Sequence, residues 1–212
     1  ALKIVMSAEN TFFQMRENPY MDEIYSRGFM TDLSKVRRNE TSPLVYHKTF
    51  NYGDCVLEKR AAAAAGINEK IFINTKGQIS EGTVCNVFFV RKNMIYTPQL
   101  SCGLLPGILR EYIMERFQVT ETIIYPDELM YYEECFVTNS LMGVMPVRQL
   151  GNICFPHRAK ADEVREVYEK EKMSLAQMMI EEKEPVDKIS KYTGYAIDKL
   201  KEIAAAMGQT LV

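Results

Sequence analysis

The sequence is poor in the residues that build metal centres and disulfide frameworks. It contains only two histidines and five cysteines in 212 residues. The cysteines are widely scattered and include no CxxC pair; they are Cys55, Cys85, Cys102, Cys135 and Cys154. An odd number at irregular spacing argues against a zinc site or a set of disulfides. We therefore expect reduced cysteines in a cytoplasmic protein and no bound metal.

A basic excess and long apolar runs are also missing. The net charge of −2 provides no surplus of cations to neutralise phosphates, so a nucleic-acid partner is not expected. No apolar run approaches the roughly 20 residues that a membrane span needs. The opening residues 1–6 read as a strand and not as a signal peptide. With 47% apolar and 25% charged residues, the composition is that of a globular chain with a sizeable core.

The hydrophobic pattern predicts a mixture of strands and helices. Helices are expected over residues 53–65, with Gly66 as the C-terminal cap, and over residues 107–117 after Pro106. Strands are expected at residues 2–6, 29–33, 70–74, 78–81, 86–90, 95–97, 119–124, 134–138 and 144–147. Residues 37–43 read as a polar loop. This order favours a mixed α/β (α+β) domain over regular βαβ winding.

Four sequence runs that could form a catalytic or binding site follow one another between residues 47 and 147. The first, H-K-T-F-N-Y, places Lys48 after a strand-like segment and before the first predicted helix. The second, from residue 74 to residue 88, contains the motif E-G-T-V-C-N-V-F, whose first residue is Glu81. Y-T-P at residues 96–98 leads to G-L-L-P-G-I-L-R at residues 103–110, and T-N-S-L-M-G-V-M-P-V closes the series at residues 138–147.

Together these runs resemble the class IV pyridoxal-phosphate aminotransferase family, which holds branched-chain aminotransferases, D-amino-acid aminotransferases and aminodeoxychorismate lyases. The likeness extends from about Leu2 to Arg148. It implies a pyridoxal 5′-phosphate cofactor and the C-terminal, cofactor-binding domain of that fold over residues 1–172. It begins about a third of the way into a complete family member, so we expect the usual N-terminal domain, with a phosphate-binding arginine and one wall of the substrate pocket, to be absent.

The resemblance implies a role for individual residues. Lys48 would form the Schiff base with the cofactor and move the proton at the substrate carbon. Glu81 would contact the pyridine nitrogen, and the residues contacting the phosphate would be Ile108, Leu109 and Ser140, the first two through backbone N–H groups. Tyr52 would lie near the cofactor ring, although its spacing from the lysine is one residue shorter than in branched-chain enzymes. Taken alone, Lys48 reads as a surface charge and Glu81 as a turn cap; the order of the four runs favours the cofactor roles.

The resemblance leaves two reactions possible, a lyase reaction and an aminotransferase reaction. An aminodeoxychorismate lyase would release 4-aminobenzoate and pyruvate without an acceptor, which is a step of folate biosynthesis. An aminotransferase would instead pass the amino group of a branched-chain or D-amino acid to a 2-oxo acid. The run from Asn139 to Met142, His47 before the lysine and the short step to Tyr52 favour the lyase. A partial domain that binds cofactor without turnover is a further alternative.

The tail departs from the family pattern, and we place a domain boundary near Met173. Residues 184–200 resemble a helix–turn–helix pair, which suggests DNA binding. Residues 173–212, however, contain five lysines, no arginine and six acidic residues. This balance favours a packed helical hairpin or a dimerisation element, with an apolar stripe formed by Ile189, Ile197, Leu200 and Ile203. We expect a homodimer that acts on a small amino substrate.

Overall fold

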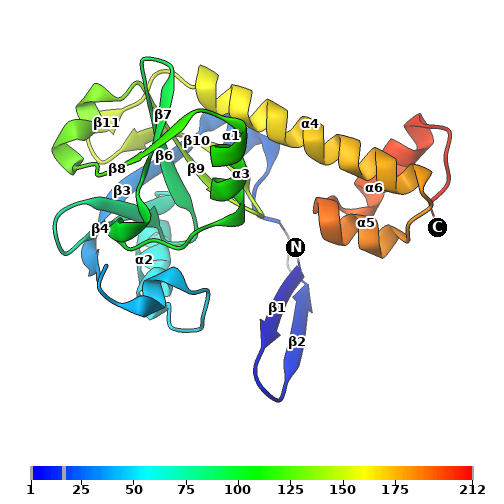
Figure 1. Ribbon diagram of the computed structural model, residues 1–212, viewed down its shortest axis with the longest axis horizontal. Helices are drawn as coiled ribbons and strands as arrows, with labels where there is room; N and C mark the ends of the chain where they lie inside the picture. Colours follow the sequence, from blue (N-terminus) through cyan, green and yellow to red (C-terminus); the bar gives the residue numbers. More distant parts are fainter. Residues whose placement is uncertain (1, 16–17, 212) are drawn as a thin grey trace. The chain divides into compact units, whose positions relative to one another are not determined.

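The computed structural model describes residues 2–15 and 18–211, and the chain divides into two compact units. The larger unit, Tyr20–Arg165, is described throughout; the smaller combines Ala1–Pro19 with Glu166–Val212. Strands and helices are mixed along the chain, as the sequence predicts (Figure 1). Among the described residues, no helix combines the length and the apolar character needed to cross a bilayer.

The Tyr20–Arg165 unit is built on one mixed, nine-stranded sheet with the order β5-β4-β3-β10-β9-β6-β7-β8, to which β11 adds beside β10. The pairs β3–β4, β3–β10 and β7–β8 are parallel and the other pairs are antiparallel. The backbone N–H of Ile79 in β5 donates to the carbonyl of Ile124, just beyond β8, at 2.8 Å. This bond joins the two ends of the strand order, so the sheet is curled. The strands are β3 (Phe29–Arg38), β4 (Glu69–Asn74), β5 (Ile79–Gly82), β6 (Asn86–Arg91), β7 (Met94–Pro98), β8 (Val119–Thr122), β9 (Glu134–Asn139), β10 (Gly143–Leu150) and β11 (Ile153–Cys154).

Central strands of this sheet are covered on both sides, and their sequences are correspondingly apolar. In β6 the run V-F-F-V is buried at every position, as is C-F-V in β9. Phe88 and Phe136 stack across these two strands with ring centroids 4.9 Å apart. Three complete helices belong to this unit, α1 (Asp22–Arg27), α2 (Gly53–Ala64) and α3 (Ile108–Arg116), together with the start of α4 (Ala159–Glu181). It also has short 3-10 turns, η1 (Pro43–Tyr46), η2 (Leu100–Cys102) and η3 (Pro126–Tyr131).

The predicted strands of the larger unit and its two predicted helices are present, with ends that differ by a few residues. Gly66 lies just beyond α2 with φ +70, the left-handed conformation that ends helices. The helix α1 and the strand β11 were not predicted, and β3 continues through Arg38 where a loop was predicted. It continues because Arg37 and Arg38 pair in parallel register with Ile73 and Asn74 of β4.

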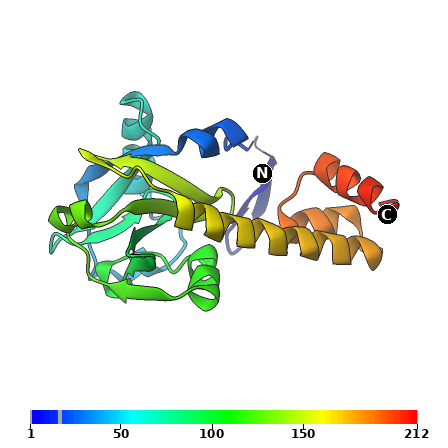
Figure 2. The same ribbon diagram turned by 90° about the horizontal axis from the view of Figure 1, so that it is seen from above.

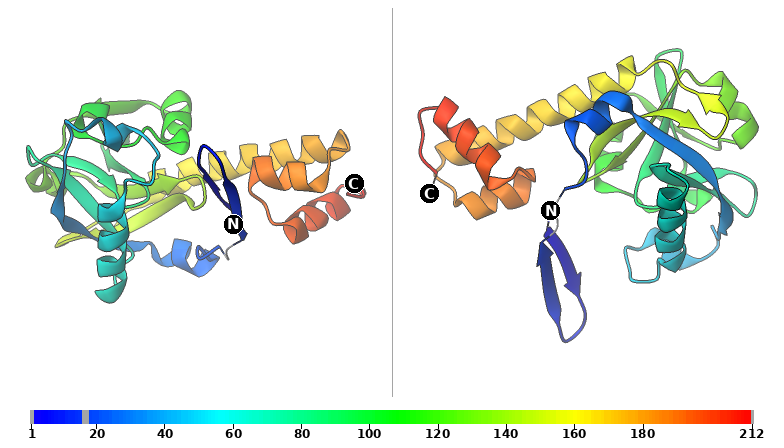
Figure 3. Two further views of the ribbon diagram at one scale, coloured as in Figure 1. Left: turned by 90° about the horizontal axis from the view of Figure 1, so that it is seen from below. Right: turned by 180° about the vertical axis from the view of Figure 1, so that it is seen from behind.

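The smaller unit contains a β-hairpin and a helical segment, which are described separately. The hairpin pairs β1 (Leu2–Met6) with β2 (Thr11–Met15) in antiparallel register (Figure 3); β2 was not predicted. The helical segment consists of the C-terminal part of α4 (Ala159–Glu181) with α5 (Val186–Thr193) and α6 (Ile197–Ala206), and Figure 2 shows α5 and α6 beside that part of α4.

The helical segment has its own apolar core. Ile189, Leu200 and Ile203 are buried against α4, as the predicted stripe requires. Ile197 is 41% exposed instead, because it is the first residue of α6 and lies one turn before the buried part of that helix. The helix α4 runs without a break past Lys172, since the sequence has neither glycine nor proline between residues 157 and 184. The predicted boundary near Met173 therefore falls inside this helix.

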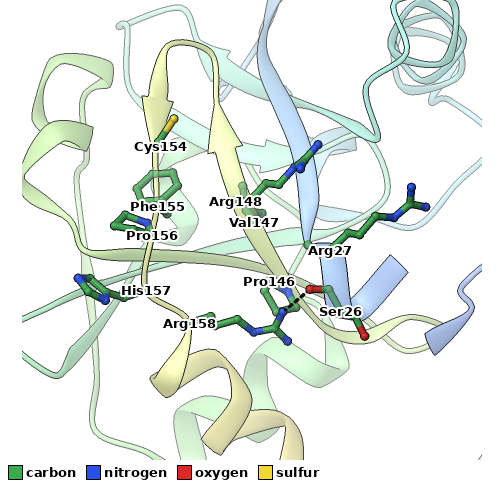
Figure 4. A pocket seen from close by; sticks show the side chains of 11 residues that line it. Ser26, Arg27, Pro146, Val147, Arg148, Cys154, Phe155, Pro156, His157 and Arg158 are labelled. Carbon is green, nitrogen blue, oxygen red and sulfur yellow. Dashed lines mark hydrogen bonds between the residues drawn. The ribbon is translucent and has the colours of Figure 1, made fainter. Parts of the chain in front are cut away.

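Arg158 joins two elements of the larger unit. Its Nε and Nη2 donate to the two carboxylate oxygens of Asp162, at 2.8 and 2.7 Å, in the first turn of α4. Its Nη1 donates to the carbonyls of Tyr25 and Ser26, at 2.9 and 3.0 Å, near the end of α1. Figure 4 shows this guanidinium in a pocket that it lines together with Arg27, Arg148 and other residues. Because these contacts use its donors internally, Arg158 serves the fold at this pocket.

We predict that Arg158→Met lowers the free energy of unfolding by about 1–3 kcal/mol, because charge-assisted hydrogen bonds at a partly exposed arginine are lost. Urea denaturation of the purified chain measures this change. Arg60→Met, at an exposed position of α2, is the matched control and should stay within about 0.5 kcal/mol of the parent chain. Equal effects of the two substitutions would contradict this role for Arg158.

Candidate functional site

A buried carboxylate lies at the centre of the candidate site. Glu81 in β5 is 4% exposed. Its Oε1 accepts a short hydrogen bond from Nη2 of Arg38, and its Oε2 accepts one from the backbone N–H of Leu105 at 3.0 Å. Burial raises the pKa of Glu81, while the charge and hydrogen bond of Arg38, the Leu105 N–H and the charge of Lys48 act in the opposite direction. The carboxylate is therefore held in place by donors from two other segments.

Arg38 is a site residue that the sequence analysis missed. It is the last residue of β3, its side chain is 14% exposed, and its guanidinium lies 4.8 Å from the ring centroid of Phe72. Its Nη1 donates to Sγ of Cys55 in α2 at 3.4 Å. The only signal in the sequence was an arginine ten residues before Lys48, within a segment read as a solvated loop. Pairing of β3 with β4 is what turns this arginine toward Glu81.

Lys48 lies in the irregular segment between η1 and α2, and its side chain is exposed. Burial raises the pKa of Glu81, and the positive charge of Lys48 is the smallest of the contributions that oppose this rise. The structure thus brings the predicted lysine and the predicted carboxylate into one region, although 33 positions separate them in the sequence. An exposed amine beside a buried carboxylate is accessible to an aldehyde, which is what a Schiff-base lysine needs.

The start of α3 offers backbone donors to an anion. Gly107 precedes the helix in an extended conformation, and within this fully described unit it supplies no side-chain cap. The N–H groups of the first turn, including those of Ile108 and Leu109, have no intrahelical acceptor, and the helix dipole favours negative charge at this end. The Ile108 side chain is 80% exposed, whereas Leu109 is 3% exposed and anchors the helix in the core.

Asn86 fixes the loop that leads into α3. Its Nδ2 donates to the carbonyl of Leu105 at 2.8 Å, while the N–H of Leu105 binds Glu81. Gly107 packs so closely that an added Cβ would lie 2.2 Å from Oδ1 of Asn86. A side chain cannot be placed at residue 107 without moving Asn86. The carboxylate of Glu81 and the N-terminus of α3 are therefore coupled through one short, tightly packed loop.

Ser140 and Tyr52 are less closely integrated. Ser140 lies exposed in the turn between β9 and β10, which Asn139 holds next to Val84 by donating from Nδ2 to the Val84 carbonyl at 3.1 Å. Tyr52 is the N-cap residue of α2 and is 39% exposed. Within the described residues, no hydrogen bond joins either side chain to Lys48, Glu81 or α3. Their cofactor roles stay predictions.

The residues fit the three requirements of pyridoxal phosphate. The cofactor needs an amine for its aldehyde, a carboxylate for its pyridine nitrogen and N–H donors for its phosphate dianion. Lys48, Glu81 and the start of α3 provide these groups from three separate segments. The loop from Leu105 to Gly107 connects the last two by direct contact. With the cofactor bound, this arrangement would place an amine that can accept a proton and a carboxylate that can contact the pyridine nitrogen in one site.

Comparison with known proteins agrees with this chemistry. The family model described as amino-transferase class IV matches residues 5–150. A probable branched-chain-amino-acid aminotransferase of Thermotoga maritima is 32% identical over 136 residues, which are 60% of this chain and 48% of that protein. The chain spans about half the length of the curated relatives it matches.

Two solved structures share the fold at moderate identity. A putative 4-amino-4-deoxychorismate lyase from Legionella pneumophila is 26% identical with a TM-score of 0.69, and the match covers 76% of this chain and 60% of that chain. The branched-chain aminotransferase of the archaeon Thermoproteus uzoniensis, solved with norvaline, is 25% identical with a TM-score of 0.63, covering 68% of this chain and 50% of that chain.

We predict that Gly107→Ala destabilises the chain by about 1–3 kcal/mol, because the new Cβ must displace Asn86 or the start of α3. Thermal unfolding measures the loss. Gly53→Ala is the matched control, since residue 53 also begins a helix but has open space around its Cβ position. Its expected effect is neutral or stabilising by up to about 1 kcal/mol. A Gly107 variant as stable as the Gly53 variant would show that the packing against Asn86 is not restrictive.

We predict that Arg38→Met raises the pKa of Glu81 further above its ordinary value, because the nearest positive charge is removed. A folded-state pKa above the unfolded value means that ionised Glu81 costs stability, and this cost develops as the pH rises from the unfolded pKa through the folded one. Arg38→Met should therefore lower the free energy of unfolding by about 3 kcal/mol at pH 7 and by less at pH 4.

Carboxyl ¹³C NMR of the glutamate side chains measures this titration, and urea denaturation at the two pH values measures the stability. Arg37→Met, at the exposed neighbouring position of β3, is the control and should leave the titration of Glu81 unchanged. The same titration midpoint for Glu81 in the Arg38 variant and in the parent chain would contradict the coupling.

Proposed function

This chain belongs to the class IV aminotransferase family, whose cofactor is pyridoxal 5′-phosphate, and we propose that it binds this cofactor and acts at the α-carbon of a small amino substrate. When bound, the cofactor withdraws electrons from the substrate α-carbon. In this proposal Lys48 binds the cofactor aldehyde and holds the proton removed from that carbon. Glu81 orients the pyridine nitrogen, and the N–H groups of Ile108 and Leu109 bind the phosphate. Ser140 adds a hydroxyl to the phosphate, and Tyr52 lies beside the ring.

One observation carries the proposal. The loop between Gly103 and Gly107 binds Glu81 through the Leu105 N–H and leads directly into the free N-terminus of α3. A few residues of chain thus set the spacing between Glu81 and the N-terminus of α3. The charge of Lys48 acts on the same carboxylate. A fold that only needed stability would have no reason to bring an exposed amine, a buried carboxylate and a free helix N-terminus together.

For the reaction we propose the lyase activity, which converts 4-amino-4-deoxychorismate into 4-aminobenzoate and pyruvate. The run from Asn139 to Met142 supports it, as does the likeness to the putative lyase of Legionella pneumophila over 76% of this chain. Aminotransfer from a branched-chain amino acid is the second candidate, favoured by the 32% identity to the Thermotoga maritima relative. A homodimer and a cytoplasmic location are proposals that rest on the resemblance alone.

The test measures products from the purified chain saturated with pyridoxal phosphate. We predict that aminodeoxychorismate yields pyruvate and 4-aminobenzoate in equal amounts without a 2-oxo acid. Lys48→Ala should lower the rate by about 10²-fold or more, because proton transfer at the substrate carbon is lost. Lys170→Ala, an exposed lysine of α4, is the control and should keep the parent rate.

Other outcomes discriminate between the candidates. Glutamate formed from leucine and 2-oxoglutarate, without pyruvate from aminodeoxychorismate, would favour the aminotransferase. No product in either assay, despite bound cofactor, would identify the chain as a partial domain. Equal rates for the Lys48 and Lys170 variants would contradict the role of Lys48 in either reaction.

A further inference from the structure

Glu40 is a buried acidic residue outside the cofactor contacts described above. Its side chain is 3% exposed and lies two residues beyond β3. Its carboxylate accepts hydrogen bonds from the backbone N–H of Thr75 at 3.1 Å and from Oγ1 of Thr75 at 2.8 Å. The amine of Lys76 lies 3.7 Å from the same carboxylate. Glu40 therefore binds the turn between β4 and β5. The strand β5 carries Glu81.

The backbone of Glu40 is tied to the segment that carries Lys48. The hydroxyl of Tyr46 donates to the Glu40 carbonyl at 2.8 Å. Tyr46 is the last residue of η1, two residues before Lys48. Between β3 and α2, a stretch that the structure describes throughout, the chain forms only this one 3-10 turn, so the position of Lys48 depends on a few such contacts. The hydrogen bond from Tyr46 therefore joins the end of η1 to the backbone of Glu40.

Glu40 also packs against the loop that leads to α3. Gly103 adopts φ +84, and an added Cβ there would lie 2.7 Å from Cα of Glu40. The carbonyl of Gly103 accepts a hydrogen bond from Oγ of Ser80 at 2.8 Å, next to Glu81. Two residues later, the N–H of Leu105 binds Glu81 itself. Three segments therefore meet at Glu40, and each leads to one of the groups assigned to the cofactor.

We propose that Glu40 is a positioning residue whose carboxylate, held by Thr75, fixes the Lys48 segment relative to Glu81 and the start of α3. This inference rests on the proposed function for its link to the cofactor. A carboxylate suits the task because it accepts both Thr75 donors at once, and charge-assisted hydrogen bonds are stronger than neutral ones. An amide at residue 40 can accept from the Thr75 N–H and donate to the Thr75 hydroxyl, but both contacts are then neutral hydrogen bonds, which are weaker.

The experiment compares Glu40→Gln and Thr75→Val with the parent chain. Hydrogen–deuterium exchange of the chain without cofactor should become about tenfold faster in residues 44–50, with no change in β6 and β9. The dissociation constant of pyridoxal phosphate, measured by absorbance, should rise about tenfold. Thr75→Ser keeps both donors and should behave like the parent chain.

Glu58→Gln is the matched control, because Glu58 in α2 also accepts a hydroxyl hydrogen bond, from Ser34 at 2.8 Å, but contacts a different part of the chain. It should leave exchange in residues 44–50 unchanged. The inference is overturned if the Glu40 variant exchanges like the parent chain in residues 44–50, or if exchange accelerates equally in the core strands. If the parent chain fails to bind pyridoxal phosphate, the proposed function fails, while the exchange data still decide the role of Glu40.

Discussion

The structure of the candidate site depends on one buried carboxyl group that needs hydrogen-bond donors. Glu81 is 4% exposed, and burial disfavours its charged form unless donors surround it. Arg38, at the end of β3, donates one hydrogen bond to this carboxylate, and the N–H of Leu105, in the loop before α3, donates another. The first contact depends on the pairing of β3 with β4 through Arg38, and the second depends on the path of the loop that Asn86 and Gly107 hold in place. The α3 N-terminus is then held at a fixed place beside the carboxylate.

This coupling explains why half the length of the relatives still carries an organised site. Glu81, the start of α3 and Lys48 all come from the part of the chain that the family model matches. The helical segment with α5 and α6 lies outside that match. In this segment Lys188 pairs with Glu184, Lys199 with Glu202 and Lys201 with Asp198, so much of its positive charge is balanced locally.

Features that depend on neighbouring residues could be predicted from the sequence, whereas features that depend on pairing between distant segments could not. Lys48 and Glu81 could be selected because each sits in a run of residues whose order is informative. Arg38 could not, since only the register between β3 and β4 turns it inward and extends the strand through a polar stretch. The boundary predicted near Met173 falls inside α4, because no glycine or proline interrupts the charged pattern before Pro185. Ile197 has the right spacing for the apolar stripe, but its place at the helix start leaves it exposed.

The most direct test is to map where pyridoxal phosphate attaches to the chain. The purified protein is mixed with the cofactor, reduced with borohydride, digested and analysed by mass spectrometry. We expect one dominant modified peptide, with the label on Lys48, and loss of that selectivity when Glu81 is replaced by glutamine. Label scattered over the exposed lysines, with Lys48 no more reactive than the others, would contradict the assignment of this site.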